Sequence, residues 1–271
     1  MSGTEAPDGS RSQFKALPSA EWSQNAVKHL MVKCQESVVR REEKVRAFQQ
    51  NEGLEGEDEE AFEEELEEEE DLLSTMVDAM GFMLKVHGEP FMNLVDEAVA
   101  PAFAPYLESN QPAALQTVAV CMLDDIFEYG GDAALKYVPH CLPIFVNNFG
   151  TDHVILKQSS VYGVAQILRF APQLCVEHLP IMVPALMELA TMQRITPEED
   201  EENEVGNEGI IENALFALGM MCHTPVLRES SWGGVVISEV AALWLKALPF
   251  RADEAEARFA SRQLCDAVEM G

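Results

Sequence analysis

The feature that most constrains the fold is an apolar pattern that repeats about every 41 residues. Three prolines occupy comparable places in the segments "EAVAPAFAPYL", "HCLPIFVNNF" and "IMVPALMELA". Pro101 and Pro143 are 42 residues apart, and Pro143 and Pro184 are 41 apart. A period of about 40 to 47 residues with two helices per unit is typical of HEAT and armadillo arrays.

Within each repeat, apolar residues recur three or four positions apart, as on one face of an α-helix. One such stripe comprises Leu73, Met76, Val77, Met80 and Leu84, and another comprises Leu115, Val118, Ala119, Met122 and Ile126. Helix stops such as "HGEP" and "YGGD" separate the stripes, and no sustained two-residue alternation indicates a strand. We therefore expect an all-α fold, a HEAT-repeat α-solenoid of antiparallel helix pairs wound into a right-handed superhelix.

The pattern divides the chain into four parts. We expect a flexible tail at 1–20, a long amphipathic helix at 21–50, an acidic linker at 51–70 and a HEAT-repeat array at 71–271. The array comprises helix pairs at 71–108, 112–150, 153–190 and 208–248, then one helix at 251–269. An acidic insertion near 195–208 accounts for the longer spacing before the fourth pair. Because a solenoid normally ends in a polar cap, this half pair leads us to expect a piece of a longer protein.

The acidity of the chain is concentrated in two places. The formal net charge is -29, yet residues 57 to 71 alone hold twelve carboxylates, and residues 197 to 208 hold seven. Such a chain repels nucleic acid and anionic lipid and attracts basic partners, so we expect no direct nucleic-acid or membrane binding. The first run has two interpretations: it is a solvated, disordered connector, or it attracts Lys- and Arg-rich proteins electrostatically. Phe62 and Leu66 are spaced so that part of it could also extend the following helix.

The candidate partner-binding residues are the two acidic tracts and one aromatic corner. Trp232 precedes two glycines in "RESSWGGVV", where it is either a surface anchor for a partner or a lid on the solenoid. The acidic candidates are Glu57, Asp58, Glu59, Glu60, Glu63, Glu64, Glu65, Glu67, Glu68, Glu69, Glu70, Asp71, Glu198, Glu199, Asp200, Glu201 and Glu202.

No other motif indicates catalysis, a metal or a cofactor. Cys175 and His178 lack two further ligands to complete a zinc site, and we interpret all six cysteines as reduced core thiols. Asp124 and Asp125 are adjacent on a helix and diverge by about 100°, so hydrogen bonds to a neighbouring repeat or to an inter-repeat loop are expected rather than acid–base chemistry. The glycine pairs lack the spacing of a phosphate-binding loop. We therefore expect neither an enzyme nor a cofactor.

The segment "CMLDDIFEYGGDAALKYVPHCLPIFVNNFGTDHVILKQSSVYGVAQIL", residues 121 to 168, resembles the carboxy-terminal HEAT repeats of the importin-beta superfamily. It is most similar to the importin beta-3 branch, also called importin five. The order of the other pieces is similar too: a long helix, an acidic tract, "DLLSTMVDAMGFMLK", "ENALFALGMMCH" and "LPFRADEAEA".

The resemblance implies a nuclear transport receptor that carries basic cargo, such as ribosomal proteins and histones, through the nuclear pore. It implies release of that cargo by the Ran GTPase, contact with nucleoporins through the whole receptor, and shuttling between cytoplasm and nucleus. The alternative is a HEAT-repeat scaffold in a regulatory or chaperone complex without a transport role.

Overall fold

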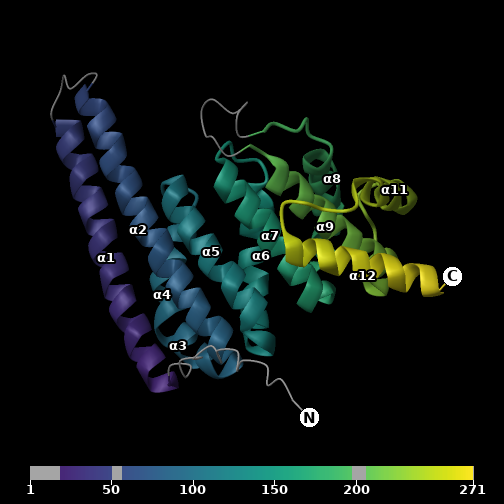
Figure 1. Ribbon diagram of the computed structural model, residues 1–271, viewed down its shortest axis with the longest axis horizontal. Helices are drawn as coiled ribbons and strands as arrows, with labels where there is room; N and C mark the ends of the chain where they lie inside the picture. The colour runs from purple at the N-terminus through teal and green to yellow at the C-terminus, as the bar shows by residue number, and fades with distance from the viewer. Residues whose placement is uncertain (1–18, 51–56, 197–205, 271) are drawn as a thin grey trace, which may run out of the picture.

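The computed structural model describes residues 19–50, 57–196 and 206–270, which form a row of helices from α1 to α12 (Figure 1). The long helices stack side by side, each on the next: α1 on α2, α2 on α5, α5 on α7 and α7 on α9. These five helices span Ala20–Gln50 (α1), Glu57–His87 (α2), Ala113–Tyr129 (α5), Val154–Phe170 (α7) and Glu208–His223 (α9).

A second layer consists of the shorter return helices. They are α6 (Val138–Asn148), α8 (Leu179–Ala190) and α11 (Ile237–Ala247), with the short α10 (Pro225–Arg228) before α11. The 3-10 turns η4 (Gly131–Tyr137) and η5 (Pro172–His178) lead into α6 and α8. The return path after α2 is composite: η1 (Glu89–Phe91), α3 (Met92–Leu94), η2 (Val95–Val99), α4 (Ala100–Phe103) and η3 (Ala104–Leu107). The helix α12 (Glu254–Met270) packs on α9.

The three repeated prolines lie in these return helices, Pro143 inside α6, Pro184 inside α8 and Pro101 in α4. Proline lacks the N–H that a helix interior needs and crowds the preceding turn. The irregular path around Pro101, which includes a π-helical turn at Val95–Val99, is consistent with this constraint.

The expected all-α HEAT-repeat architecture is confirmed, and no strand occurs in the described ranges. The apolar stripes form the core: Leu73, Val77 and Met80 of α2 are each 1% exposed, and Ala119 and Ile126 of α5 are equally buried. Four of the six cysteines are buried thiols, but Cys265 is exposed on α12, so the expectation of a core position is wrong for that residue.

Residues 57–70, expected in the acidic linker, form the first half of α2. Phe62 and Leu66 are half-buried, and the Phe62 ring stacks on Phe48 of α1, with centroids 4.0 Å apart and planes 8° apart. The apolar seam with α1 therefore orders a stretch that its charge alone would leave solvated. Residues 51–56, most of the expected tail and most of the acidic insertion lie outside the described residues.

Candidate functional site

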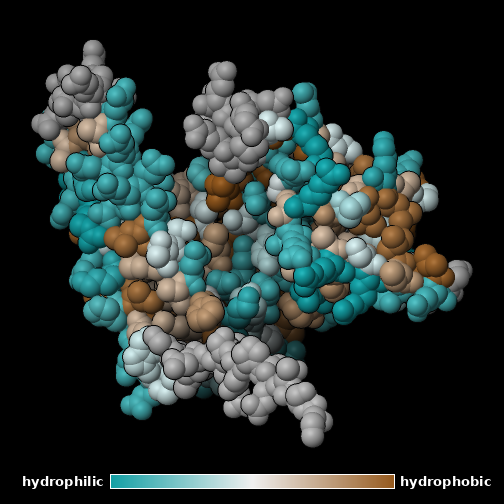
Figure 2. Space-filling view, in the orientation of Figure 1, coloured by the Kyte–Doolittle hydropathy of each residue, from teal (hydrophilic) through white to brown (hydrophobic). Residues whose placement is uncertain are grey.

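The first candidate surface is the acidic arm, which comprises residues 37–50 of α1 and 57–71 of α2. In Figure 1 the paired ends of α1 and α2 extend beyond the neighbouring α5, and Figure 2 shows their largely hydrophilic surface. One side of the acidic half of α2 faces α1, and its other sides face solvent. The arm therefore presents carboxylates in two different environments.

On the side facing α1, Glu69 is held in a network of donors. Its carboxylate accepts hydrogen bonds from Ser37 Oγ at 2.5 Å, from Arg40 Nε at 2.8 Å and from Arg40 Nη2 at 2.9 Å. Only 7% of Glu69 is exposed, and the hydrogen bonds of Arg40 lower the pKa of its carboxyl group. Glu69 is thus an anchor between the two helices rather than a free charge.

Two further cations of α1 neutralise neighbouring carboxylates. Arg41 Nη2 lies 3.1 Å from Glu70 Oε1, and Lys44 Nζ lies 3.3 Å from Glu65 Oε2. The sequence of the acidic run contains no cation, but α1 supplies three: Arg40 and Arg41 lie 29 positions before their partners, and Lys44 lies 21 positions before Glu65. Glu65, Glu69 and Glu70 are consequently less available to a partner than expected.

The solvent-facing carboxylates of α2 have no such partners. Six predicted candidates are exposed and form no ion pair among the described residues: Glu60, Glu63, Glu64, Glu67, Glu68 and Asp71. Glu57, Asp58 and Glu59 lie in the first turn of the same helix. Exposed like charges at this spacing repel one another and create a strongly negative local potential.

The remaining predicted candidates are the second acidic tract and Trp232. Glu198, Glu199, Asp200, Glu201 and Glu202 lie outside the described residues. Trp232 is only 3% exposed, and its Nε1 donates a hydrogen bond to the Leu227 carbonyl at 2.7 Å. It is therefore not a surface anchor. The following Gly233 has φ of 61°, and an added Cβ there would meet the Pro180 carbonyl oxygen at 2.2 Å, so the corner closes tightly onto α8.

Asp124 and Asp125 of α5 pack against glycines of the two flanking helices. An added Cβ at Gly81 of α2 would lie 1.7 Å from Asp125 Oδ2, and one at Gly163 of α7 would lie 2.3 Å from Asp124 Oδ1. The predicted hydrogen bonding is wrong for one atom, because Asp124 Oδ1 has no hydrogen-bond partner. Burial, and then repulsion from Asp125, raises the pKa of Asp124 well above its usual range. Burial and the neighbouring Glu128 raise the pKa of Asp125 to about 7.

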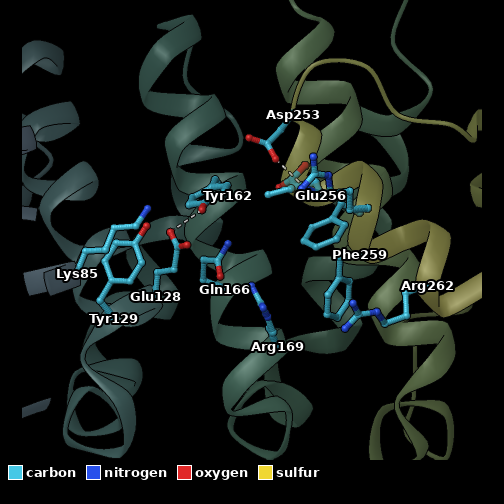
Figure 3. Close-up of a pocket in the computed structure, with 13 residues that line it drawn as sticks. Lys85, Glu128, Tyr129, Tyr162, Gln166, Arg169, Asp253, Glu256, Phe259 and Arg262 are labelled. Carbon is cyan, nitrogen blue, oxygen red and sulfur yellow. Dashed lines mark hydrogen bonds between the residues drawn. The ribbon is translucent and has the colours of Figure 1, made fainter. Parts of the chain in front are cut away.

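The second candidate surface, which the sequence did not reveal, is a groove of about 440 Å³ beside α12. We call it the α12 groove. Figure 3 shows its side chains coming from α2, α5, α7 and α12. The lining includes Lys85, Glu128, Tyr162, Arg169, Glu256 and Arg262.

Contacts along the α12 groove hold its side chains in place. Tyr162 Oη donates to Glu128 Oε2 at 2.8 Å, and the Asp253 carboxylate accepts the Glu256 backbone N–H at 2.7 Å (Figure 3). The Arg169 guanidinium lies over the Phe259 ring, 5.0 Å from its centroid. The only sequence signal was the recurrence of Tyr162, Gln166 and Arg169 at helical spacing, which predicts one shared face but no facing partner.

Other site classes find no support in the part of the chain that the structure describes. No three His, Cys, Asp or Glu side chains there are placed to hold a metal ion. Among the described helices, none combines the length and the hydropathy of a membrane-spanning segment.

A family model and a curated relative both indicate a similarity to importins. Residues 20–109, which contain α1, α2 and the composite return path, match the family described as importin repeat 6. A protein of Dictyostelium discoideum described as a "probable importin-5 homolog" is 26% identical over 203 residues, covering 70% of this chain and 18% of its own length.

Solved structures of the karyopherin Kap121p share the fold. Kap121p bound to the SUMO protease Ulp1p has a TM-score of 0.66 and 18% identity, covering 93% of this chain and 21% of that chain. Kap121p bound to Pho4p has a TM-score of 0.63 and 16% identity, covering 91% and 20%. The chain thus spans about a fifth of the length of these relatives. The predicted resemblance to the importin-beta superfamily is confirmed.

Proposed function

We propose that this chain, a HEAT-repeat segment of importin-beta type, forms part of a nuclear transport receptor and attracts basic protein cargo with the acidic arm. The observation that carries the proposal is the division of charge on α2. Carboxylates facing α1 are neutralised, whereas six exposed ones have no ion-pair partner among the described residues. A partner rich in Lys and Arg is the natural complement of that surface.

The similar proteins support a binding role rather than a catalytic one. Kap121p has been solved bound to other proteins, Ulp1p and Pho4p among them. By analogy, the longer protein would carry ribosomal proteins, histones or other basic cargo, respond to Ran, contact nucleoporins and shuttle between cytoplasm and nucleus. The importin five branch is the one we favour, because the described relative carries that name.

The arm is expected to contribute attraction rather than sequence specificity. Its free carboxylates are exposed, so each pairing with a cationic side chain is worth about 0.2–1 kcal/mol and is weakened by salt. Several such pairings along one helix speed the encounter with a basic segment. Selection among basic segments must then come from another surface.

The test uses two variants with the same net charge. In the arm variant, Glu60, Glu63, Glu64, Glu67 and Glu68 become Gln. In the control, five scattered exposed glutamates become Gln: Glu97, Glu108, Glu177, Glu188 and Glu229. A labelled Lys-rich histone-tail peptide is titrated against each by fluorescence anisotropy, at low and at physiological ionic strength.

We expect the arm variant to weaken binding about tenfold at low salt, as five weak pairings together imply, and the control to change it far less. The difference should shrink at physiological salt. Equal affinity of both variants would mean that net charge alone matters and that the arm has no cargo role. No binding by any form would favour the scaffold alternative.

A further inference from the structure

A second cavity, of about 270 Å³, opens beside the α12 groove between α5, α7, α9 and the residues that lead into α12. We call it the carboxylate cavity, because Asp124, Asp253 and Glu256 border it and its lining includes no Lys, Arg or His. Tyr162, Asp253 and Glu256 line both hollows, so the two adjoin. Figure 3 shows Asp253 and Glu256 across the space from Tyr162 and Glu128.

The walls of these hollows contain buried acceptors that lack a donor. Glu256 is 5% exposed, and its Oε1 has no hydrogen-bond partner. Its Oε2 lies 3.2 Å from the Asn213 side-chain amide, whose nitrogen donates when the amide is turned to face it. Gln166, 2% exposed on the wall of the α12 groove, likewise leaves its Oε1 unpaired. Buried polar atoms are normally paired, so unpaired acceptors at the rim of a cavity indicate a missing donor.

The raised pKa of Glu256 is consistent with a carboxylate that lacks a cationic partner. Burial, followed by repulsion from Asp253, Glu212 and Glu128, raises the pKa of Glu256 to about 8. Glu212 itself accepts the backbone N–H groups of Arg251 and Ala252, both at 2.7 Å, and is already satisfied. A cation in the cavity would compensate the Glu256 carboxylate and favour its ionised form.

The chemistry of the cavity selects among cations. The described residues place no three ligands for a metal ion. A lysine ammonium has three donors and no acceptor on a flexible stem, so it can reach acceptors on opposite walls. The Tyr162 ring offers an apolar surface to the methylene groups of the lysine stem.

The α12 groove beside the cavity carries charges of both signs, since Lys85, Arg169, Arg258 and Arg262 line it together with Glu128, Asp253 and Glu256. Lys85, Arg169 and Arg262 line it and form no ion pair with a carboxylate in the described ranges. Arg258 is paired with the exposed Glu254 at 2.5 Å. A polybasic segment would bring further cations against these three side chains, whereas acidic residues next to a lysine would be attracted to them.

We propose that the carboxylate cavity receives the ammonium group of one lysine side chain, and that the α12 groove holds acidic residues flanking this lysine in a protein segment. The inference rests on the proposed function in one respect, namely that the ligand belongs to a protein cargo. The carboxylate cavity lies on a surface separate from the acidic arm. Its ligand has one lysine with acidic neighbours, whereas the ligand of the arm is rich in Lys and Arg.

The test uses the whole chain with two synthetic capped peptides, one with a single Lys between Asp and Glu residues and one with Gln in place of that Lys. Glu256→Gln removes the charge at the cavity, and Glu269→Gln removes an exposed charge on the same helix. Because Glu256→Gln replaces the buried carboxyl group by a neutral amide of the same shape, we expect it to fold, and a thermal melt checks this.

The Lys peptide is expected to bind the unaltered chain, with Kd weakened about tenfold or more by Glu256→Gln and unchanged by Glu269→Gln. Binding should also tighten between about pH 6 and pH 9, as Glu256, which faces Asp253, Glu212 and Glu128, becomes ionised. Equal binding of the Lys and Gln peptides, or an unchanged Kd in Glu256→Gln, would overturn the proposal.

The histone-tail peptide separates this inference from the proposed function. Its binding should respond to the arm variant and not to Glu256→Gln, whereas the Lys peptide should show the reverse pattern. A loss of both peptides in Glu256→Gln would mean a disturbed fold or a single shared site, and would also refute a separate lysine cavity.

Discussion

The raised pKa of Glu256 predicts that stability falls as pH rises, and that Glu256→Gln removes part of this fall. In the folded chain the pKa is about 8, against an ordinary value of 4.5. Between these values the folded state retains a proton that the unfolded state has released, so unfolding becomes easier with increasing pH. Above about pH 8 both states are ionised, and this contribution levels off.

The size of the effect follows from the shift. Each pKa unit corresponds to about 1.4 kcal/mol, so the full shift sets an upper bound of about 5 kcal/mol. Relaxation and water entry at the open cavity reduce such values, and we expect about 2 kcal/mol between pH 5 and pH 9. Asp125, with a pKa of about 7, adds a contribution of the same sign that Glu256→Gln leaves in place.

The assay is native-state hydrogen exchange of α12 and α9 amides, corrected for intrinsic exchange, together with thermal melts at both pH values. Exchange is preferred because helical arrays open locally. Glu256→Gln should be more stable than the unaltered chain at pH 9 and similar to it at pH 5, whereas Glu269→Gln should follow the unaltered chain. An identical pH dependence in all three proteins would refute the argument that Glu256 is buried without a partner.

Further perturbations test other contacts. Gly163→Ala should cost about 1–3 kcal/mol in urea unfolding, because its Cβ would meet Asp124 and Phe145, whereas Gly150→Ala, with a nearest contact of 3.8 Å, should be nearly neutral. Trp232→Phe should lower the free energy of unfolding by about 1 kcal/mol, because the hydrogen bond to Leu227 is lost. Trp22→Phe, at a position 57% exposed, should leave the urea midpoint unchanged. Similar losses in both variants would contradict the buried position of Trp232. The lowered pKa of Glu69 has the opposite sign to that of Glu256: its stabilisation is present above about pH 4.5 and is lost as pH falls through the folded-state value. Acid should therefore increase hydrogen exchange in the arm, less so in Glu69→Gln, and an arm insensitive to acid would exclude this anchor.

Much of the fold could be predicted from the sequence, because helices are specified by local spacing. The predicted pair at 112–150 corresponds to α5 through α6, and the pair at 153–190 to α7 through α8. Side chains three and four positions apart share a face whatever their distant neighbours are. The repeat of about 41 residues then implies that each pair stacks on the next.

The sequence was a weaker guide to the environment of single side chains. The charge of residues 57–71 suggested a solvated linker, yet Arg40, Arg41 and Lys44 lie against it. Trp232 was a candidate anchor and is buried. Glycines inside helices, such as Gly81 and Gly163, indicate that a neighbouring group approaches the backbone closely. They do not indicate that the approaching groups are the carboxylates of Asp125 and Asp124.

The sequence by itself determined the helices, their pairing and the concentration of negative charge, since all three depend on residues near one another in the chain. Only the tertiary structure decided which carboxylates are neutralised, which are free and which are buried without a donor. The α12 groove is lined from Lys85 of α2 to Arg262 of α12 by side chains of five helices. Its charge pattern depends on the stacking of successive repeats, because the environment of each side chain is set by helices that local spacing does not identify.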